Sequence, residues 1–229
     1  MATFYKTLDN AQDVASTRTL LHEAIPLTGT IVSGTYADDN IKNYSHGMFQ
    51  SVYDYPHLSS SANHIFDITV GVSTDSSLYN TSHNQYQKKR NIYNQMAQVL
   101  MGYDHTGSVQ NFDEDGDISG GGDKMNDVTF LNFSRLLVKD EIKKGSFLLE
   151  LGISQSSGFS PGNHMGDRIK IQDTSGSDGY FVNSPAGEYG ILFADSTVGT
   201  NLTTDDGTQK AGLLFYQAGI AVVTASVFA

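Results

Sequence analysis

The chain has 229 residues, carries 14 Lys and Arg against 25 Asp and Glu for a formal net charge of -11, and contains no cysteine. The acidic surplus argues against a general nucleic-acid binder and against an anionic membrane surface as partner, because both require Lys and Arg. The lack of cysteine excludes disulfides, zinc–thiolate sites and thiol catalysis. No apolar run is long enough to cross a bilayer, and the polar N-terminus is not typical of a signal peptide, so we expect synthesis in the cytosol.

The composition predicts a mainly β fold. Glycine, serine, threonine, asparagine and tyrosine are frequent and proline is scarce, which is typical of short strands joined by tight turns. We expect one β-sandwich or barrel-like domain over residues 15–229, preceded by a polar arm over residues 1–14. A short helix over residues 15–25, capped by Ser16 or Thr17, is expected to open the domain.

One prominent helix is predicted over residues 84–101. Tyr93, Met96 and Leu100 lie at spacings of three, four and seven residues, as in the apolar stripe of an amphipathic helix. Gly102 follows, and a glycine at this position commonly ends a helix. The Lys-Lys-Arg run on the polar side suggests a solvated face or an edge that forms ion pairs with another subunit.

Short apolar segments bounded by turn residues predict the strands. They cover residues 29–36, 64–71, 128–133, 146–151, 168–172, 180–182, 188–194 and 211–217. The last run, residues 219–229, stays apolar and β-branched almost to its final residue. We therefore expect it to be held in a sheet, either its own or that of a neighbouring chain. In the second case Val227 and Phe228 are interface residues.

Residues 40–61 mix aromatic and polar side chains without a clear period. Two interpretations are open: an extended loop lying on a partner, or an internal loop over the core. On a partner surface the aromatic side chains anchor the contact, because they bury a large area at low entropic cost. The candidate interface residues of this segment are Tyr44, Phe49, Tyr53 and Tyr55.

The acidic stretch over residues 111–123 has the pattern of a calcium loop. Counted from Asn111, oxygen-bearing side chains occupy the first, third and fifth positions and a glycine occupies the sixth. Gly122 stands where a bidentate glutamate is usual, so a solvated acidic turn is the alternative. The candidate ligands of a calcium ion are Asn111, Asp113, Asp115, Asp117 and Asp123.

Catalytic motifs are missing from the sequence. It contains no H-E-x-x-H pair, no Walker loop, no dinucleotide fingerprint and no G-x-S-x-G elbow. We therefore expect a protein without enzyme activity, catalytic residues or an organic cofactor. Carboxylate pairs for glycoside hydrolysis are defined by their distance in space, so a hydrolase that uses Asp104, Asp113 or Asp115 is an alternative.

Three stretches carry a resemblance to a known family. They are NYSHGMFQSVYDYPHLSSSANHIFD over residues 43–67, YNQMAQVLMGYDHTG over residues 93–107 and FLNFSRLLVKDEIKKG over residues 130–145. These stretches resemble an uncharacterised virion structural protein of contractile-tailed marine cyanophages. The likeness runs over most of the chain, including NSPAGEYG at residues 183–190 and the C-terminal run.

The resemblance implies a component of the virus particle, made in the host cytoplasm and working through contacts with other virion proteins and with copies of itself. It brings no active site with it. The tail or baseplate is the expected location, and a head decoration or surface protein is the alternative. A calcium-dependent carbohydrate- or receptor-binding β-module is a further alternative, because tyrosine-rich loops and a divalent ion suit sugar binding.

Overall fold

A computed structural model describes most of the chain from residue 40 onward. The described residues are 40–79, 82, 84–116, 124–137, 141–153, 167–176, 178–194, 204–205 and 208–228. The polar arm, the first helix and the first strand expected from the sequence lie outside them. None of the helices in the described part of the chain combines the length and the apolar character needed to span a membrane.

The described residues form one eleven-stranded sheet, one α-helix and two short 3-10 helices. The strands are β1 (Ile41–Asn43), β2 (Gln50–Tyr53), β3 (His64–Val72), β4 (Asp127–Asn132), β5 (Leu148–Ile153), β6 (Asp167–Gln172), β7 (Phe181–Ser184), β8 (Gly187–Ala194), β9 (Thr204–Asp205), β10 (Thr208–Phe215) and β11 (Ile220–Thr224). The helices are α3 (Asn84–Leu100), η2 (Ser134–Leu136) and η3 (Ala225–Phe228). The predicted mainly β fold with one prominent helix is confirmed.

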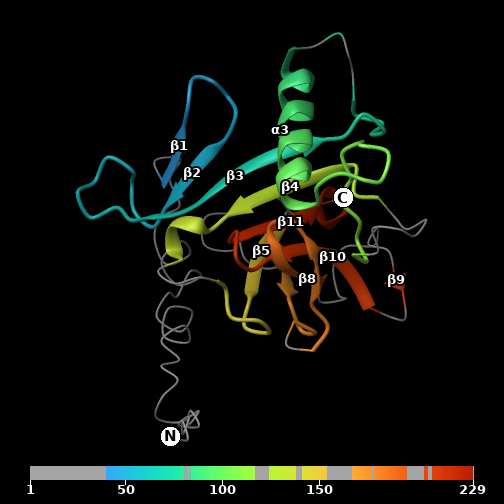
Figure 1. Ribbon diagram of the computed structural model, residues 1–229. Helices are drawn as coiled ribbons and strands as arrows, with labels where there is room; N and C mark the ends of the chain where they lie inside the picture. Colours follow the sequence, from blue (N-terminus) through green and yellow to red (C-terminus); the bar gives the residue numbers. More distant parts are fainter. Residues whose placement is uncertain are drawn as a thin grey trace, which may run out of the picture.

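The sheet is antiparallel throughout the described pairs. Its strand order is β1-β2-β3-β4-β11-β10-β8-β6-β5, with β7 beside β8 and β9 beside β10. The sheet bends strongly along this path, so that β5 and β8 run in a different direction from β3 and β4 (Figure 1). Helix α3 lies over β3, and the β1–β2 hairpin stands beside the helix at one end of the sheet (Figure 1).

Helix α3 approaches β3 closely because Gly71 has no side chain. A Cβ atom at Gly71 would lie 2.6 Å from Cε2 of Phe130 and 3.1 Å from Cβ of Tyr93. The helix buries Ile92, Tyr93, Ala97 and Leu100 against the sheet. It ends as predicted, because Gly102 adopts a φ of 83° and its N–H donates to the Ala97 carbonyl at 3.0 Å.

The central strands are buried on both faces. Neighbouring residues of one strand point to opposite faces, so Phe130 and Phe215 lie on the helix side while Leu131 and Leu214 lie on the other side. The second core is completed by residues from η2, β5, β6 and η3. Burial on both faces explains why these strands are continuously apolar in sequence.

Tyr93 connects the helix to the segments on either side of the acidic loop. Its hydroxyl donates to the Met125 carbonyl at 2.8 Å and accepts from the Phe112 N–H at 3.2 Å. Its ring meets the Phe112 ring edge-on, with centroids 5.4 Å apart. Burial raises the pKa of the hydroxyl, so it stays protonated and keeps both hydrogen bonds.

The first prediction concerns this hydroxyl. Tyr93→Phe leaves a buried N–H and a buried C=O without their partner, and each such loss costs about 1–3 kcal/mol. The free energy of unfolding, measured in urea, should therefore fall by about 2–6 kcal/mol for the two groups together. Tyr103→Phe is the matched control, because Tyr103 is 54% exposed, and it should change the value by less than about 0.5 kcal/mol. Equal effects of the two changes would contradict the role given to Tyr93.

Candidate functional site

Residues 40–61 form a β-hairpin and a structured turn, where the sequence suggested a loop. Strands β1 and β2 pair with Ile41 opposite Val52, and β2 continues the sheet through β3. The loop prediction was wrong because β1 has only three residues and β2 only four, too few to show a period of two. We call residues 40–61 the wing.

The tip of the wing is a cluster of three rings. Tyr44 and His46 stack with centroids 5.1 Å apart, and Phe49 packs 4.9 Å from Tyr44 and 5.1 Å from His46. The ammonium group of Lys42 lies 5.0 Å from the centre of the Tyr44 ring, within cation–π range. Contacts among the rings therefore hold the tip in shape, while Phe49 stays exposed at its surface.

Two lysines of α3 fasten this tip to the helix. Lys88 Nζ donates to the His46 carbonyl at 3.3 Å. Lys89 Nζ donates to the Gly47 and Met48 carbonyls at 3.4 and 3.2 Å, and burial together with the neighbouring Lys88 lowers the pKa of Lys89. The sequence analysis predicted a solvated face or a subunit contact for this basic run. It could not predict the contacts with the hairpin, because helical spacing alone does not show which carbonyls lie opposite the lysines.

The base of the wing is held by Asp67 of β3. Its Oδ1 accepts from Ser51 Oγ at 2.5 Å and lies 2.7 Å from His64 Nε2. Ser51 in turn lies 3.2 Å from the Tyr44 hydroxyl, and the Tyr53 ring meets the His64 ring edge-on. Tyr44 and Tyr53, both candidate interface residues, are therefore half-buried and serve the packing of the wing itself.

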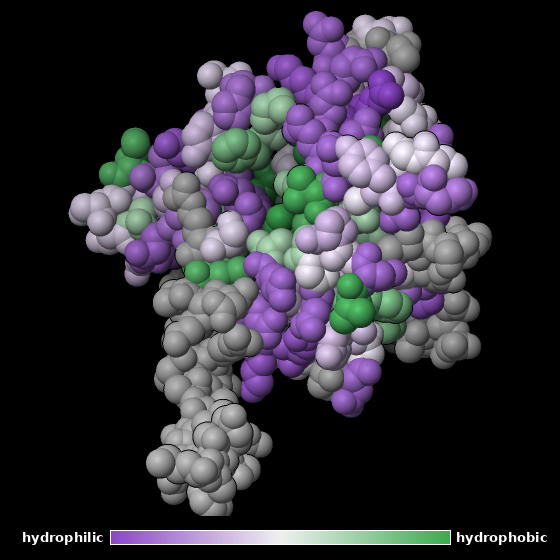
Figure 2. Space-filling view, viewed as in Figure 1, coloured by the Kyte–Doolittle hydropathy of each residue, from purple (hydrophilic) through white to green (hydrophobic). Residues whose placement is uncertain are grey.

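The far end of the wing exposes large apolar side chains. Tyr55 is 52% exposed and Leu58, which the sequence analysis did not select, is 89% exposed. Their turn has a defined shape, because the Asp54 carboxylate accepts from the Asn63 N–H at 2.6 Å and from the Asn63 amide at 2.8 Å. At this end of the molecule, hydrophobic residues lie on the surface among polar residues (Figure 2).

The C-terminal run belongs to the chain's own sheet. Strand β11 pairs with β4 on one side and β10 on the other. Val227 is 1% exposed inside the second core, so its expected place in an interface is corrected. The run is apolar because a central strand and the helix after it are covered on both faces. The side chain of Phe228 lies outside the described part.

The acidic loop is closed at its base by an ion pair. Asp113 and Lys124 form a backbone bridge, and the Lys124 ammonium lies 2.5 Å from the Asp113 carboxylate. Burial, followed by the hydrogen bond with Asp115, raises the pKa of Asp113 despite this cation. Asn111 and Asp115 are half-buried beside it. The remaining two candidate ligands, Asp117 and Asp123, lie outside the described residues.

The positive charge that a calcium ion would supply to Asp113 is provided by Lys124. Among the described residues, no group of three or more His, Asp or Glu side chains is arranged to hold a metal ion. Asp104 also has partners: its carboxylate accepts from the Thr106 N–H at 2.8 Å and the Ser108 N–H at 2.9 Å, and the hydrogen bonds from this turn lower its pKa. The calcium site stays a prediction.

The second prediction concerns the calcium hypothesis. Because Lys124 already neutralises Asp113, the melting temperature should be the same in calcium and in a chelator. A native-state ligand raises the melting temperature by mass action, so any bound calcium must produce a shift. Stabilisation by calcium that is lost in the variant Asp115→Asn would contradict this expectation and support the predicted calcium site.

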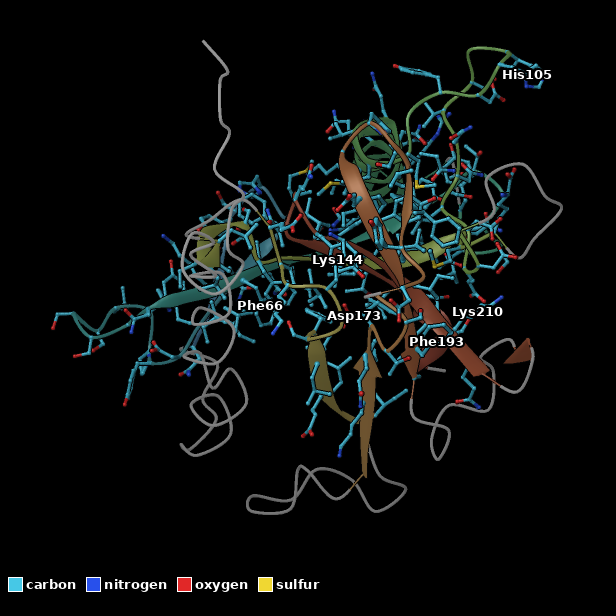
Figure 3. All side chains as sticks on the ribbon, turned by 60° about the horizontal axis from the view of Figure 1, so that its bottom comes forward. Phe66, His105, Lys144, Asp173, Phe193 and Lys210 are labelled. Atoms are coloured by element: carbon cyan, nitrogen blue, oxygen red, sulfur yellow. The ribbon has the colours of Figure 1, made fainter. Side chains whose placement is uncertain are left out.

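A second buried polar cluster was not predicted from the sequence. Asp173 accepts from the Gly145 N–H at 2.7 Å, the Phe147 N–H at 2.9 Å and the Tyr216 hydroxyl at 3.3 Å. Next to it, Lys144 lies 2.5 Å from the Glu188 carboxylate and 5.3 Å from the Tyr216 ring centre. Figure 3 shows Lys144 and Asp173 close together and His105 on a distant turn. The cluster fixes the segment that leads into β5.

The third prediction uses the titration of Asp173. Burial raises its pKa above the ordinary value of 3.8, so the folded chain binds this proton more tightly than the unfolded chain. Its contribution to the free energy of unfolding is therefore largest below the ordinary pKa and falls as the pH rises through the raised value. The stability of the wild type relative to Asp173→Asn should decline as the pH rises above about 4 in urea titrations. A constant difference would contradict the raised pKa.

A shallow hollow lies at the C-terminal end of α3. Its volume is about 590 Å³, and its lining residues are Met101, Gly102, Tyr103, Gln110, Asn183 and Pro185. No carboxylate, histidine or lysine is among these lining residues.

Comparison with known proteins gave no match. A scan against protein-family models, a search of curated proteins and a search of solved structures each found nothing similar to this chain. The functional proposal therefore rests on the geometry of the wing and on the resemblance seen in the sequence.

Proposed function

We propose that this protein is a non-enzymatic structural subunit of a phage particle that works through protein–protein contacts made by the wing. The observation that carries the proposal is the exposure of Phe49, Tyr55 and Leu58 on a segment that the chain itself holds in shape. Exposed aromatic and aliphatic side chains on a fixed scaffold are typical of the anchors of protein interfaces.

The wing is suited to binding because its conformation is already fixed in the free chain, so binding costs little further conformational entropy. The contacts of Lys88 and Lys89 with the tip, and of Asp67 with the base, exist before any partner arrives. A preformed surface pays less for ordering when it binds, and more of its contact energy becomes affinity. The rest of the described chain packs into its own core, whereas the wing lies at one end of the sheet.

The absence of enzyme activity is part of this proposal. The described carboxylates considered for hydrolysis have structural roles: Asp104 shapes its turn, and Asp113 pairs with Lys124. Within the particle, the tail or baseplate is our proposed location, and the head surface is the alternative. The virion assignment itself comes from the sequence resemblance, and the wing supplies the means of attachment.

The fourth prediction tests the proposed function. Mass spectrometry of purified particles should detect the protein as a stoichiometric component. The variant Tyr55→Ser with Leu58→Ser should reduce its incorporation by about tenfold or more, because each anchor contributes on the order of 1–2 kcal/mol to binding.

The matched control is Val99→Ser with Val182→Ser, which removes two side chains that are 62% and 70% exposed elsewhere on the surface. This control should enter particles normally. Absence of the protein from purified particles would overturn the virion assignment. Equal incorporation of both double variants would remove the wing from the contact.

A further inference from the structure

The hollow at the C-terminal end of α3 is built from three segments of the chain. They are the end of the helix, the hairpin that follows it and the turn between β7 and β8. The residues that line it are Met101, Gly102, Tyr103, Gln110, Asn183 and Pro185. Its volume of about 590 Å³ lies within the range of about 300–1,000 Å³ that is usual for small-molecule sites. The hollow is therefore large enough to hold a small ligand.

The three segments are fastened to one another. The Ser184 hydroxyl donates to the Leu100 carbonyl at the end of the helix. The Gln110 N–H donates to the Gly102 carbonyl at 3.0 Å, which folds the hairpin back onto the helix end. Pro185 packs so closely that a Cβ atom on Gly102 would lie 3.3 Å from its Cγ. The walls are thus in place in the free chain, and a ligand pays little to order them.

The side-chain amides of the lining have hydrogen-bonding capacity to spare. Gln110 is half-buried, and its side chain makes no hydrogen bond with any described residue. Asn183 uses its Oδ1 to accept from the Tyr189 hydroxyl at 2.8 Å, while its NH₂ group donates to none of the described residues. An amide offers two donors and one acceptor oxygen, so the two side chains together can both donate to a ligand and accept from it.

The aromatic ring of the lining is also free to make contacts. Tyr103 is 54% exposed. In the described ranges, no other aromatic ring packs on it and no group hydrogen-bonds to its hydroxyl. Pro185 and Met101 add apolar surface to the same lining. The hollow therefore presents an apolar platform next to two amides, and an aromatic side chain with a polar tip suits a ligand that has both kinds of surface.

The electrostatics of the hollow favour a neutral ligand. The lining has no Asp, Glu, Lys, Arg or His. The C-terminal end of a helix carries a partial negative charge, and the whole chain has a formal charge of -11, so an anion is repelled. The carboxylate of the adjacent Asp104 is engaged by the N–H groups of Thr106 and Ser108. No lining carboxylate is present to hold a cation either.

We infer that this hollow binds a neutral saccharide. A sugar ring has an apolar C–H face that packs on an aromatic ring, and its hydroxyls donate and accept hydrogen bonds as the side-chain amides require. The site goes beyond the proposed function, and it uses no calcium ion. Met101 follows Lys89, which holds the wing, by 12 residues, or about 18 Å along a helix. The wing and the hollow are therefore separate surfaces.

A titration followed by nuclear magnetic resonance tests the inference. The ¹⁵N-labelled full chain is titrated with glucose, galactose, mannose and N-acetylglucosamine, each into the millimolar range. We expect at least one of these sugars to shift the backbone amides of residues 101–103, 110 and 183–184 in a saturable manner. Absence of saturable shifts with all four sugars, or shifts confined to other segments, would overturn the inference.

Substitutions in the lining provide the second measurement. Tyr103→Ala should weaken binding of the sugar by about tenfold, because the apolar platform is lost, whereas Tyr103→Phe keeps the ring and should keep most of the affinity. Gln110→Ala should also weaken binding and breaks no hydrogen bond with a described residue. Tyr55→Ala is the matched control, because Tyr55 is 52% exposed on the wing. Equal affinities of the wild type and Tyr103→Ala would overturn the inference.

A chelator and the purified particles separate the possible explanations. Binding should be the same with and without excess chelator, and loss of binding in the chelator would assign the sugar to a metal site and overturn the inference. A chain that is found in particles but binds none of the four sugars would remove this inference and leave the proposed function intact. A chain that binds sugar through Tyr103 but is absent from particles would remove the proposed function alone.

Discussion

The Tyr93 hydroxyl is the contact on which the arrangement of this protein depends. It satisfies one N–H and one C=O from segments on both sides of the acidic loop, and its ring lies within the core beneath α3. The Phe112 ring beside it continues the packing to Phe130 and Phe215 of the sheet. Helix, loop and sheet are thereby joined in one packed core.

The chain completes the core with its own residues, and the wing lies at one end of the sheet. It is joined to the body by polar contacts with β3 and α3, and the Asn40 amide, which donates to the carbonyls of Tyr53 and Asp54, fixes the point where the chain enters β1. These contacts stabilise the shape of the wing without covering Tyr55 or Leu58. The same geometry therefore accounts for a stable fold and for an exposed apolar surface at the end of the sheet.

The sequence predicts those features that depend on local patterns. The stripe of α3, its end at Gly102 and most central strands are recovered within a few residues, because burial imposes a period or a continuous apolar run. The wing, the Asp67 network and the Lys144–Asp173 cluster depend on residues far apart in the chain. Nothing in the local sequence shows that Lys89 faces Met48. The C-terminal run was correctly predicted to lie in a sheet. Its apolar pattern could not show whether that sheet belonged to the chain itself or to a neighbour.

The central claim is that the wing is a preformed docking element on a core that completes itself. Hydrogen exchange of the subunit, free and in assembled particles, tests it most directly. The claim predicts that backbone amides of residues 41–58 exchange more slowly after assembly, while those of β10 and β11 are already protected in the free subunit. Unchanged exchange in the wing, together with new protection confined to the central strands, would contradict it.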